Sequence, residues 1–285
     1  MASVAAFWKP LSSVVNFSFH QDYASHIVLV IPISAYFIYR KHTEIFSTVQ
    51  TAPLPGILLF LTGIICLFLA STLRASPFHN NELSLVTLAI VVIWVSAFIF
   101  FYGARAFYRA LFPLLFLLLL VPIPEIAVDK IIALLQAGSA QVAYGLLRLL
   151  SIPVLKQGFI LRMPNLDIEV AKECSGIRSS LALLVTALVL GELVLRSAWK
   201  KALWVLSIIP ILIFKNGVRI VTLCLLTLYV DPGFLHGWLH TSGGILFYLL
   251  GFAILLPLLN ALRKSERHTP PSLQPVLPNV HKHPV

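Results

Sequence analysis

The feature that most limits the fold of this chain is a series of apolar stretches, several of them long enough to cross a lipid bilayer. Of the 285 residues, 59% are hydrophobic and 11% are charged, whereas a water-soluble domain is about 45–50% apolar. A bilayer core needs about 20 consecutive, mainly apolar residues per helix. The sequence therefore predicts an all-α polytopic membrane protein with about seven or eight transmembrane helices.

Basic residues occur in clusters between the apolar stretches. The formal net charge is +10, an excess that in a soluble protein would favour a nucleic-acid partner. In a membrane protein, Lys and Arg instead accumulate in cytoplasmic loops. We therefore expect no nucleic-acid partner, and we assign the basic clusters to the cytoplasmic face. These clusters lie at residues 40–42, 105–109, 196–201 and 263–267.

Segment boundaries follow from breaks in the apolar pattern. Residues 1–267 are expected to form one membrane domain, because no repeat or linker divides them, and residues 268–285 to form a disordered cytoplasmic tail. Residues 1–26 favour a partial or tilted first span. Residues 125–150 carry polar side chains at helical spacing, which predicts an interfacial or partly buried helix. Residues 159–173 alternate apolar and polar side chains around a Pro-Asn pair, which predicts an extracytoplasmic β-hairpin.

Three polar residues from separate segments are predicted to lie at the outer membrane face, namely Cys174, Arg219 and His240. Cys174 immediately precedes a predicted apolar helix, and the N-terminus of a helix lowers the pKa of a thiol. Arg219 lies about 25 Å along its helix from the cytoplasmic Lys201, and an arginine inside a membrane is a functional-site candidate. His240 has the chemistry to deprotonate the thiol and to protonate a leaving amine.

Each of these residues also has a plainer interpretation. A cysteine near a helix start is often structural, and Arg219 is long enough to reach the interface and bind lipid phosphate. His236 and His240 are four residues apart and can share a helical face, which allows a metal site. Two histidines without a nearby carboxylate are a weak metal signal, so the sequence predicts neither a metal nor another cofactor.

The other two cysteines, Cys66 and Cys224, lie deep inside apolar runs. A cysteine in such surroundings usually packs as a small hydrophobic residue. The spacing of the three cysteines predicts no disulfide framework.

Three motifs resemble those of the exosortase/archaeosortase family and occur in that family's order. CSGIRSS, from Cys174, is similar to the nucleophile motif. NGVRI, residues 216–220, resembles the arginine motif, and HTSGGILF, residues 240–247, resembles the histidine motif. The stretch GFILRMPNLDIEV looks like the extracytoplasmic segment that precedes the family's cysteine. Together these similarities cover about residues 120–250.

The resemblance implies a cysteine-type transpeptidase or peptidase of the prokaryotic plasma membrane. Its expected partners are membrane lipids and exported proteins with a C-terminal, PEP-CTERM-like sorting signal. Such a signal consists of a short motif such as Pro-Glu-Pro, a transmembrane helix and a basic tail. The implied roles are nucleophile for Cys174, oxyanion stabilisation for Arg219 and proton transfer for His240, through a thioacyl-enzyme formed at the extracytoplasmic face.

Several neighbours of these motifs are supporting or substrate-binding candidates. Glu173 departs from the small residue common in the family, and its charge opposes formation of a thiolate. The alternative to an enzyme is a non-catalytic membrane protein: a sorting-signal binder, a transporter or a scaffold in polysaccharide export. A transporter places its ionisable residues near the bilayer midplane, whereas here they gather toward one face. The supporting candidates are Glu173, Ser175, Gly176, Arg178, Asn216, His236 and Gly244.

Overall fold

The fold is mainly helical. The computed structural model describes residues 7–72, 79–164, 166–170, 176–235 and 243–267. The helices of the N-terminal part are α2 (Trp8–His20), η1 (Asp22–Ala24), α3 (Ile27–Arg40), α4 (His42–Ile45), α5 (Pro53–Thr72), α6 (His79–Arg109), α7 (Leu111–Phe116) and η3 (Leu117–Leu120). Those of the C-terminal part are α8 (Glu125–Leu149), α9 (Ile177–Val194), α10 (Ala198–Tyr229), η5 (Pro232–Leu235) and α12 (Gly244–Arg267).

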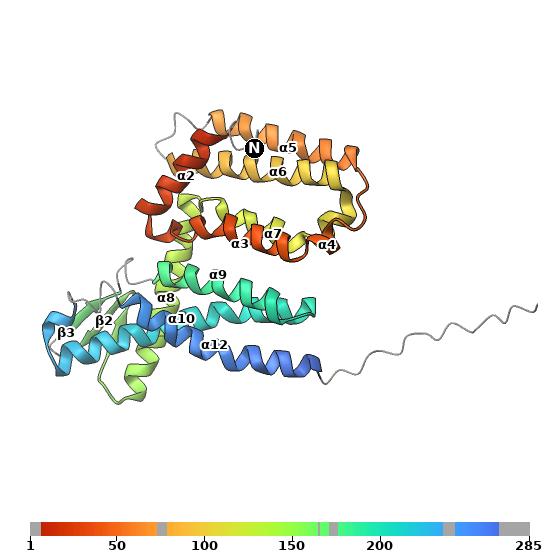
Figure 1. Cartoon of the computed structure of the whole chain (residues 1–285). Helices are drawn as coiled ribbons and strands as arrows, with labels where there is room; N and C mark the ends of the chain where they lie inside the picture. Colours follow the sequence, from red (N-terminus) through yellow and green to blue (C-terminus); the bar gives the residue numbers. More distant parts are fainter. Residues whose placement is uncertain (1–6, 73–78, 165, 171–175, 236–242, 268–285) are drawn as a thin grey trace, which may run out of the picture.

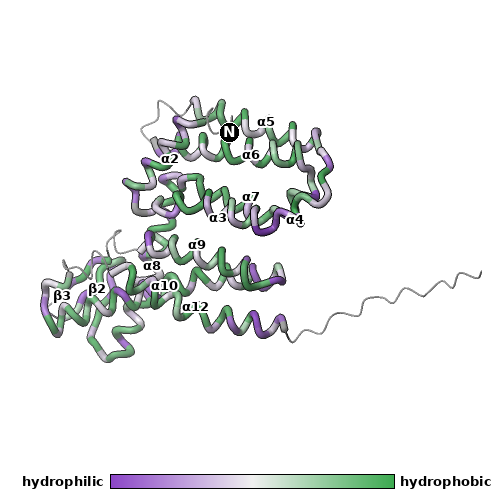
Figure 2. Tube along the Cα trace, in the orientation of Figure 1, coloured by the Kyte–Doolittle hydropathy of each residue, from purple (hydrophilic) through white to green (hydrophobic). Residues whose placement is uncertain are grey.

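Within the described residues, six helices are long and apolar enough to cross a membrane, namely α5, α6, α8, α9, α10 and α12. Two shorter apolar helices cover Ile27–Arg40 and Leu111–Leu120. Hydrophobic residues run along the long helices, and hydrophilic residues gather near their ends (Figure 2). The predicted all-α, polytopic membrane fold is therefore confirmed, and the chain is a multi-pass membrane protein.

The helices form two groups, which lie side by side in Figure 1. One group contains α2 to α7 and the other contains α9, α10 and α12, while α8 runs across the second group. The ends of α3, α6, α9 and α12 and the start of α10 all lie on the right in Figure 1, which brings the predicted basic clusters to one side of the molecule. The sheet and the starts of α9 and α12 lie toward the opposite side.

The predicted β-hairpin is present as β2 (Ile160–Met163) and β3 (Leu166–Glu169), which pair antiparallel. A third strand, β1 (Leu155–Gln157), adds to β2, so the sheet has the order β1-β2-β3. Alternate side chains of the hairpin are buried with apolar residues of α8 and α10. The sheet is thus fixed to the two helices that carry the polar residues described below. The buried sheet residues in this cluster are Leu161, Met163 and Ile168.

Two ambiguous segments of the sequence have definite structures. The helix α2 has 13 residues. At about 1.5 Å per residue it is shorter than the thickness of a bilayer core, so its length agrees with a partial span. The helix α8 is partly buried, as predicted, with Gln136 and Ser139 on its buried face. Its polar residues Asp129, Lys130 and Gln141 are exposed.

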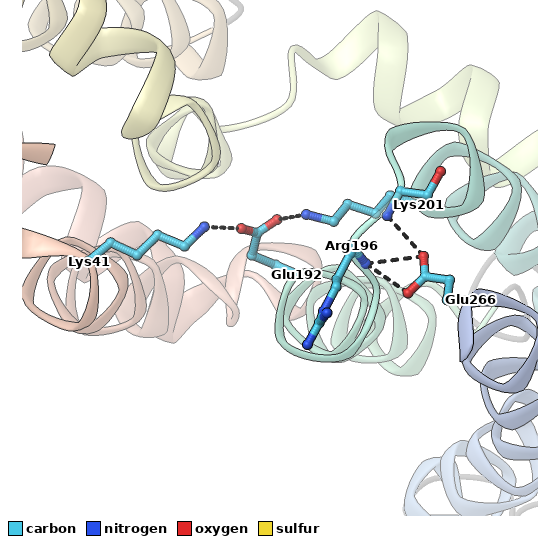
Figure 3. A network of polar contacts seen from close by, with 6 residues as sticks. Lys41, Glu192, Arg196, Lys201 and Glu266 are labelled. Atoms are coloured by element: carbon cyan, nitrogen blue, oxygen red, sulfur yellow. Dashed lines mark hydrogen bonds and ion pairs between the residues drawn. The ribbon is translucent and has the colours of Figure 1, made fainter. Parts of the chain in front are cut away.

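A carboxylate at the basic side links the two helix groups (Figure 3). Glu192 of α9 has a side chain only 6% exposed, and its Oε1 lies 2.6 Å from Nζ of Lys41, at the end of α3. Its other oxygen accepts a hydrogen bond from Lys201 of α10. Beside it, Glu266 of α12 accepts hydrogen bonds from the backbone N–H groups of Arg196 and Ser197. Carboxylates therefore neutralise part of the basic side and connect α3, α9, α10 and α12.

We expect Glu192→Gln to lower the free energy of unfolding by about 1–3 kcal/mol, because it leaves two partly buried ammonium groups without their counter-charge. Thermal unfolding of the purified protein in detergent measures this loss. Glu44→Gln, at an exposed position in α4, is the matched control and should change the midpoint little. Equal midpoints of thermal unfolding for the two variants would show that water or lipid phosphate stabilises the ammonium groups of Lys41 and Lys201 instead.

A glycine interrupts α6 where it approaches the chain before α5. Gly103 has φ +83° and ψ 175°, outside the helical region. A Cβ at this position would lie 1.8 Å from the backbone oxygen of Gln50. No side chain other than hydrogen fits there, and residues with a Cβ disfavour this φ.

Gly103→Ala should therefore destabilise the protein by more than the ~1–3 kcal/mol of a strained backbone alone, since the clash with Gln50 adds to the strain. Gly145→Ala is the control, because that position in α8 has no neighbouring atom within 4 Å. Alanine in a helix should stabilise it by about 0.5–1 kcal/mol. Thermal unfolding should thus give shifts of opposite sign, and shifts of the same sign would contradict the described geometry at Gly103.

Candidate active site

The buried face of α10 carries three polar side chains in an otherwise apolar helix. Lys215, Asn216 and Arg219 are 1%, 2% and 7% exposed. Residues three and four apart share a helical face, so Arg219 lies one turn beyond the other two on the same face. Burying such groups in a membrane-spanning helix is costly unless they are hydrogen-bonded, and ionisable residues there are usually functional.

Lys215 fixes the first turn of α9. Its Nζ donates a hydrogen bond to Oγ of Ser179, and this hydroxyl donates to the backbone oxygen of Gly176 at 3.0 Å. The aliphatic part of Lys215 packs at α12, where a Cβ on Gly251 would lie 3.2 Å from Cδ of the lysine. The buried side chain of Lys215 thus links α10 with the first turn of α9 and packs at α12.

Asn216 connects α10 with α8 and with the residue that precedes α9. Its Nδ2 donates to Oγ of Ser139 at 3.0 Å. Gly176 adopts φ +65°, and a Cβ there would lie 2.8 Å from Oδ1 of Asn216. The next residue, Gly217, allows the close approach of α8, because its Cβ would lie 2.5 Å from the side chain of Val142. Small residues commonly permit such close helix contacts in membranes.

A further hydrogen bond holds the chain that enters residues 171–175. Nε2 of Gln136, buried on α8, donates to the backbone oxygen of Val170, directly after β3. Val170 and Gly176 flank residues 171–175, so the described residues on both sides of that segment are held by neighbouring side chains of α8 and α10. We refer to the residues concerned as the polar cluster, which consists of Gln136, Ser139, Gly176, Ser179, Lys215, Asn216 and Arg219.

The start of α12 lies beside the polar cluster. A Cβ on Gly244, the first residue of α12, would lie 4.0 Å from Cβ of Ser179. One turn further on, Oη of Tyr248 is 3.0 Å from Oγ1 of Thr186 on α9. The first turns of α9 and α12 are therefore adjacent, although residues 176 and 244 are far apart in the sequence (Figure 1).

The structure brings part of the predicted site together. Gly176, Asn216 and Arg219 belong to the polar cluster, and Gly244 lies beside it. Arg178 is exposed on the first turn of α9. The remaining candidates stay predictions, because they lie outside the described residues; they are Glu173, Cys174, Ser175, His236 and His240.

Four residues of the polar cluster were not site candidates from the sequence, namely Gln136, Ser139, Ser179 and Lys215. Gln136 and Ser139 are polar side chains inside an apolar stretch, Ser179 belongs to the CSGIRSS motif and Lys215 directly precedes the arginine motif. These signals could have identified them. Of the other cysteines, Cys224 is fully buried between α8, α10 and the sheet, in agreement with its predicted packing role. Cys66 is half-buried on α5.

Comparison with known families gives a match over most of the chain. The sequence profile of the family described as transmembrane exosortase matches residues 17–257. The chain belongs to the transmembrane exosortase family. The match contains all three motifs and confirms the resemblance seen in the sequence. No curated protein and no solved structure matches the chain.

The contact of Gly176 with Asn216 in this exosortase can be tested with two glycines of similar backbone conformation. Gly158, between β1 and β2, has φ +61° and no atom within 4 Å of a Cβ, whereas Gly176 has φ +65° and the Asn216 contact. Alanine at either position pays about 1–2 kcal/mol for the left-handed conformation. Gly176→Ala should cost about 1–3 kcal/mol more in thermal unfolding, because it displaces the buried amide of Asn216.

Ser139→Ala sharpens this comparison. It removes the partner of Asn216, so its effect and that of Gly176→Ala should combine less than additively in the double variant. Equal losses of stability for Gly158→Ala and Gly176→Ala would show that the hydrogen bond of Asn216 does not depend on the close approach of Gly176. Full additivity of Gly176→Ala with Ser139→Ala would show the same.

Proposed function

We propose that this exosortase is a cysteine-type transpeptidase or peptidase that cleaves C-terminal, PEP-CTERM-like sorting signals of exported proteins. The reaction takes place at the extracytoplasmic face of a prokaryotic plasma membrane. The observation that carries the proposal is the convergence of Val170, Gly176 and Gly244 around the polar cluster. These residues flank or follow the segments that contain Cys174 and His240.

Chain length supports this convergence. A chain spans at most about 3.6 Å per residue, so the Cα of Cys174 lies within about 7 Å of that of Gly176. By the same limit, the Cα of His240 lies within about 14 Å of that of Gly244. Since the first turns of α9 and α12 are adjacent, these limits allow both residues to approach one substrate bond.

The proposed mechanism has two stages. His240 takes the proton of the Cys174 thiol, and the thiolate attacks a backbone carbonyl carbon of the sorting signal. The oxyanion is stabilised by Arg219 and by backbone N–H groups at the start of α9, which have no partner within the helix. The C–N bond then breaks as His240 protonates the leaving amine, giving a thioacyl-enzyme. An amine or water, deprotonated by His240, attacks the thioester and restores the thiol.

The polar cluster has two roles in this proposal. Its hydrogen bonds fix the start of α9, so the residues that precede the helix are held by a rigid support. The guanidinium of Arg219, with the positive end of the α9 dipole, favours a thiolate at Cys174. The charge of Glu173 acts against this effect.

The position of the polar cluster along α10 supports an extracytoplasmic site. Lys201 and Arg219 belong to one continuous helix, Ala198–Tyr229, and 18 residues at about 1.5 Å each separate them by about 27 Å. This distance is close to the thickness of a bilayer core, about 30 Å. If the basic side faces the cytoplasm, Arg219 lies near the outer interface, where a signal that precedes a transmembrane helix would be cut.

The catalytic assignment predicts that Cys174→Ala and His240→Ala each lower the rate of substrate processing by at least about 100-fold. Arg219→Gln should act similarly, since removal of one oxyanion donor costs about 10²–10³ in rate. The full-length protein would be co-expressed with an exported protein bearing a tripartite C-terminal signal, and the substrate's size would be followed by immunoblot.

Matched controls are Cys66→Ala and Cys224→Ala, which should process the substrate at nearly the native rate. Comparable amounts of each variant in the membrane would be verified in the same samples. Processing by Cys174→Ala at the native rate would rule out this nucleophile. If the native protein binds the substrate without shortening it, the sorting-signal binder is the correct alternative.

A further inference from the structure

A concave site, separate from the polar cluster, lies between the end of α8 and the strands β1 and β2. Its volume is about 660 Å³, and its polar lining consists of Tyr144, Arg148, Ser151 and Arg162. Of the described residues that line it, none carries a carboxylate. Two guanidinium groups at one cavity favour an anionic ligand, because each can donate charge-assisted hydrogen bonds to it.

Each arginine keeps donors for such a ligand. Arg148 stacks over the ring of Tyr144, with Cζ 5.8 Å from the ring centroid, and Nη1 lies 3.4 Å from the tyrosine hydroxyl. The aromatic ring thus orients the guanidinium at the cavity. Nε of Arg162 is 3.6 Å from Oδ2 of Asp167, an exposed and therefore weak ion pair. A guanidinium has five N–H donors, so one contact through Nε leaves others for a ligand.

Ser151, another polar residue at the cavity, has an unusual backbone conformation. The helix α8 ends in a Schellman motif, in which Ile152 N–H donates to Leu147 O and Ser151 N–H donates to Arg148 O, both at 3.0 Å. The left-handed residue of this motif is usually glycine, but here it is Ser151, with φ +60°. It is the one non-glycine residue with a positive φ in the described part of the chain. Strain of this kind concentrates at functional sites, and this residue lines the cavity.

The surroundings identify a lipid as the source of the anion. The cavity lies at the end of α8, a helix of membrane-spanning length. Leu149, Leu150 and Leu155 next to it are 79%, 54% and 57% exposed. Exposed leucines beside arginines are typical of the region where acyl chains meet headgroups. A site for a soluble anion would place these leucines in water.

We propose that this cavity binds the headgroup phosphate of an anionic phospholipid. Arg148 and Arg162 contact the phosphate oxygens, and Ser151 donates its hydroxyl. The neighbouring leucines contact the acyl chains. Since β3 leads through Val170 into residues 171–175, a lipid held here also anchors the sheet to the membrane surface beside the polar cluster.

Native mass spectrometry of the purified full-length protein tests the proposal, with phosphatidylglycerol and phosphatidylcholine as probes. The native protein should retain phosphatidylglycerol in preference to phosphatidylcholine. The double variant Arg148→Gln/Arg162→Gln should bind phosphatidylglycerol at least about tenfold more weakly, because it loses two charge-assisted contacts. Arg105→Gln, an exposed arginine on α6 at the basic side, is the control and should bind normally.

Ser151→Gly is a second test variant, in which weaker lipid binding would not result from impaired folding. Relief of the left-handed strain should raise the thermal midpoint, whereas loss of the hydroxyl should weaken phosphatidylglycerol binding. Unchanged lipid binding in the double arginine variant, or equal weakening in Arg105→Gln, would overturn the site. Displacement of the lipid by millimolar inorganic phosphate would assign the cavity to a soluble anion and overturn the lipid source.

Discussion

The arrangement of the C-terminal helices depends on the need of buried polar groups in α10 to find hydrogen-bond partners away from water. The amino group of Lys215 and the amide of Asn216 cannot stay unsatisfied in a membrane-spanning helix without a large cost in free energy. Their partners lie on α9 and α8, at Ser179 and Ser139. Apolar packing alone would allow these helices to slide or rotate, whereas the hydrogen bonds fix which residues face one another.

The same helix has a second set of polar contacts at its other end. Lys201 shares the carboxylate of Glu192 with Lys41, and Lys200 donates to the hydroxyl of Ser265 at 3.2 Å. At the basic side, ion pairs connect both helix groups, whereas at the polar cluster the contacts are hydrogen bonds among α8, α9 and α10. The protein thus separates a charged, structural end from an end where the polar groups of the proposed site gather.

Much of the fold was predictable because it follows from local patterns. The length of the apolar stretches predicted the membrane-spanning helices. The alternation of apolar and polar side chains around Pro164 predicted the hairpin of β2 and β3. The strand β1 was not predicted, because three residues without a regular alternation give no signal. The break at Gly103 was also missed, since it is set by the distant backbone of Gln50.

The candidate site was predictable only in part. Arg219, Asn216 and Gly176 were found through their motifs, and the structure places them in the polar cluster. Ser139, the partner of Asn216, belongs to a helix 77 residues earlier in the chain, and no local pattern indicates which serine of a helix meets which amide. The roles of Cys174 and His240 rest on the sequence and on chain connectivity.

The close contact between α8 and α10 also decides from where a substrate can approach. A Cβ on Gly138 would lie 3.0 Å from the side chain of Ile213, and one on Gly217 would lie 2.5 Å from that of Val142. Backbones this near leave no width for an acyl chain or a guest helix between them. The seam between α8 and α10 is therefore closed to lateral entry, and a helical substrate anchored in the bilayer has to reach the polar cluster from another side.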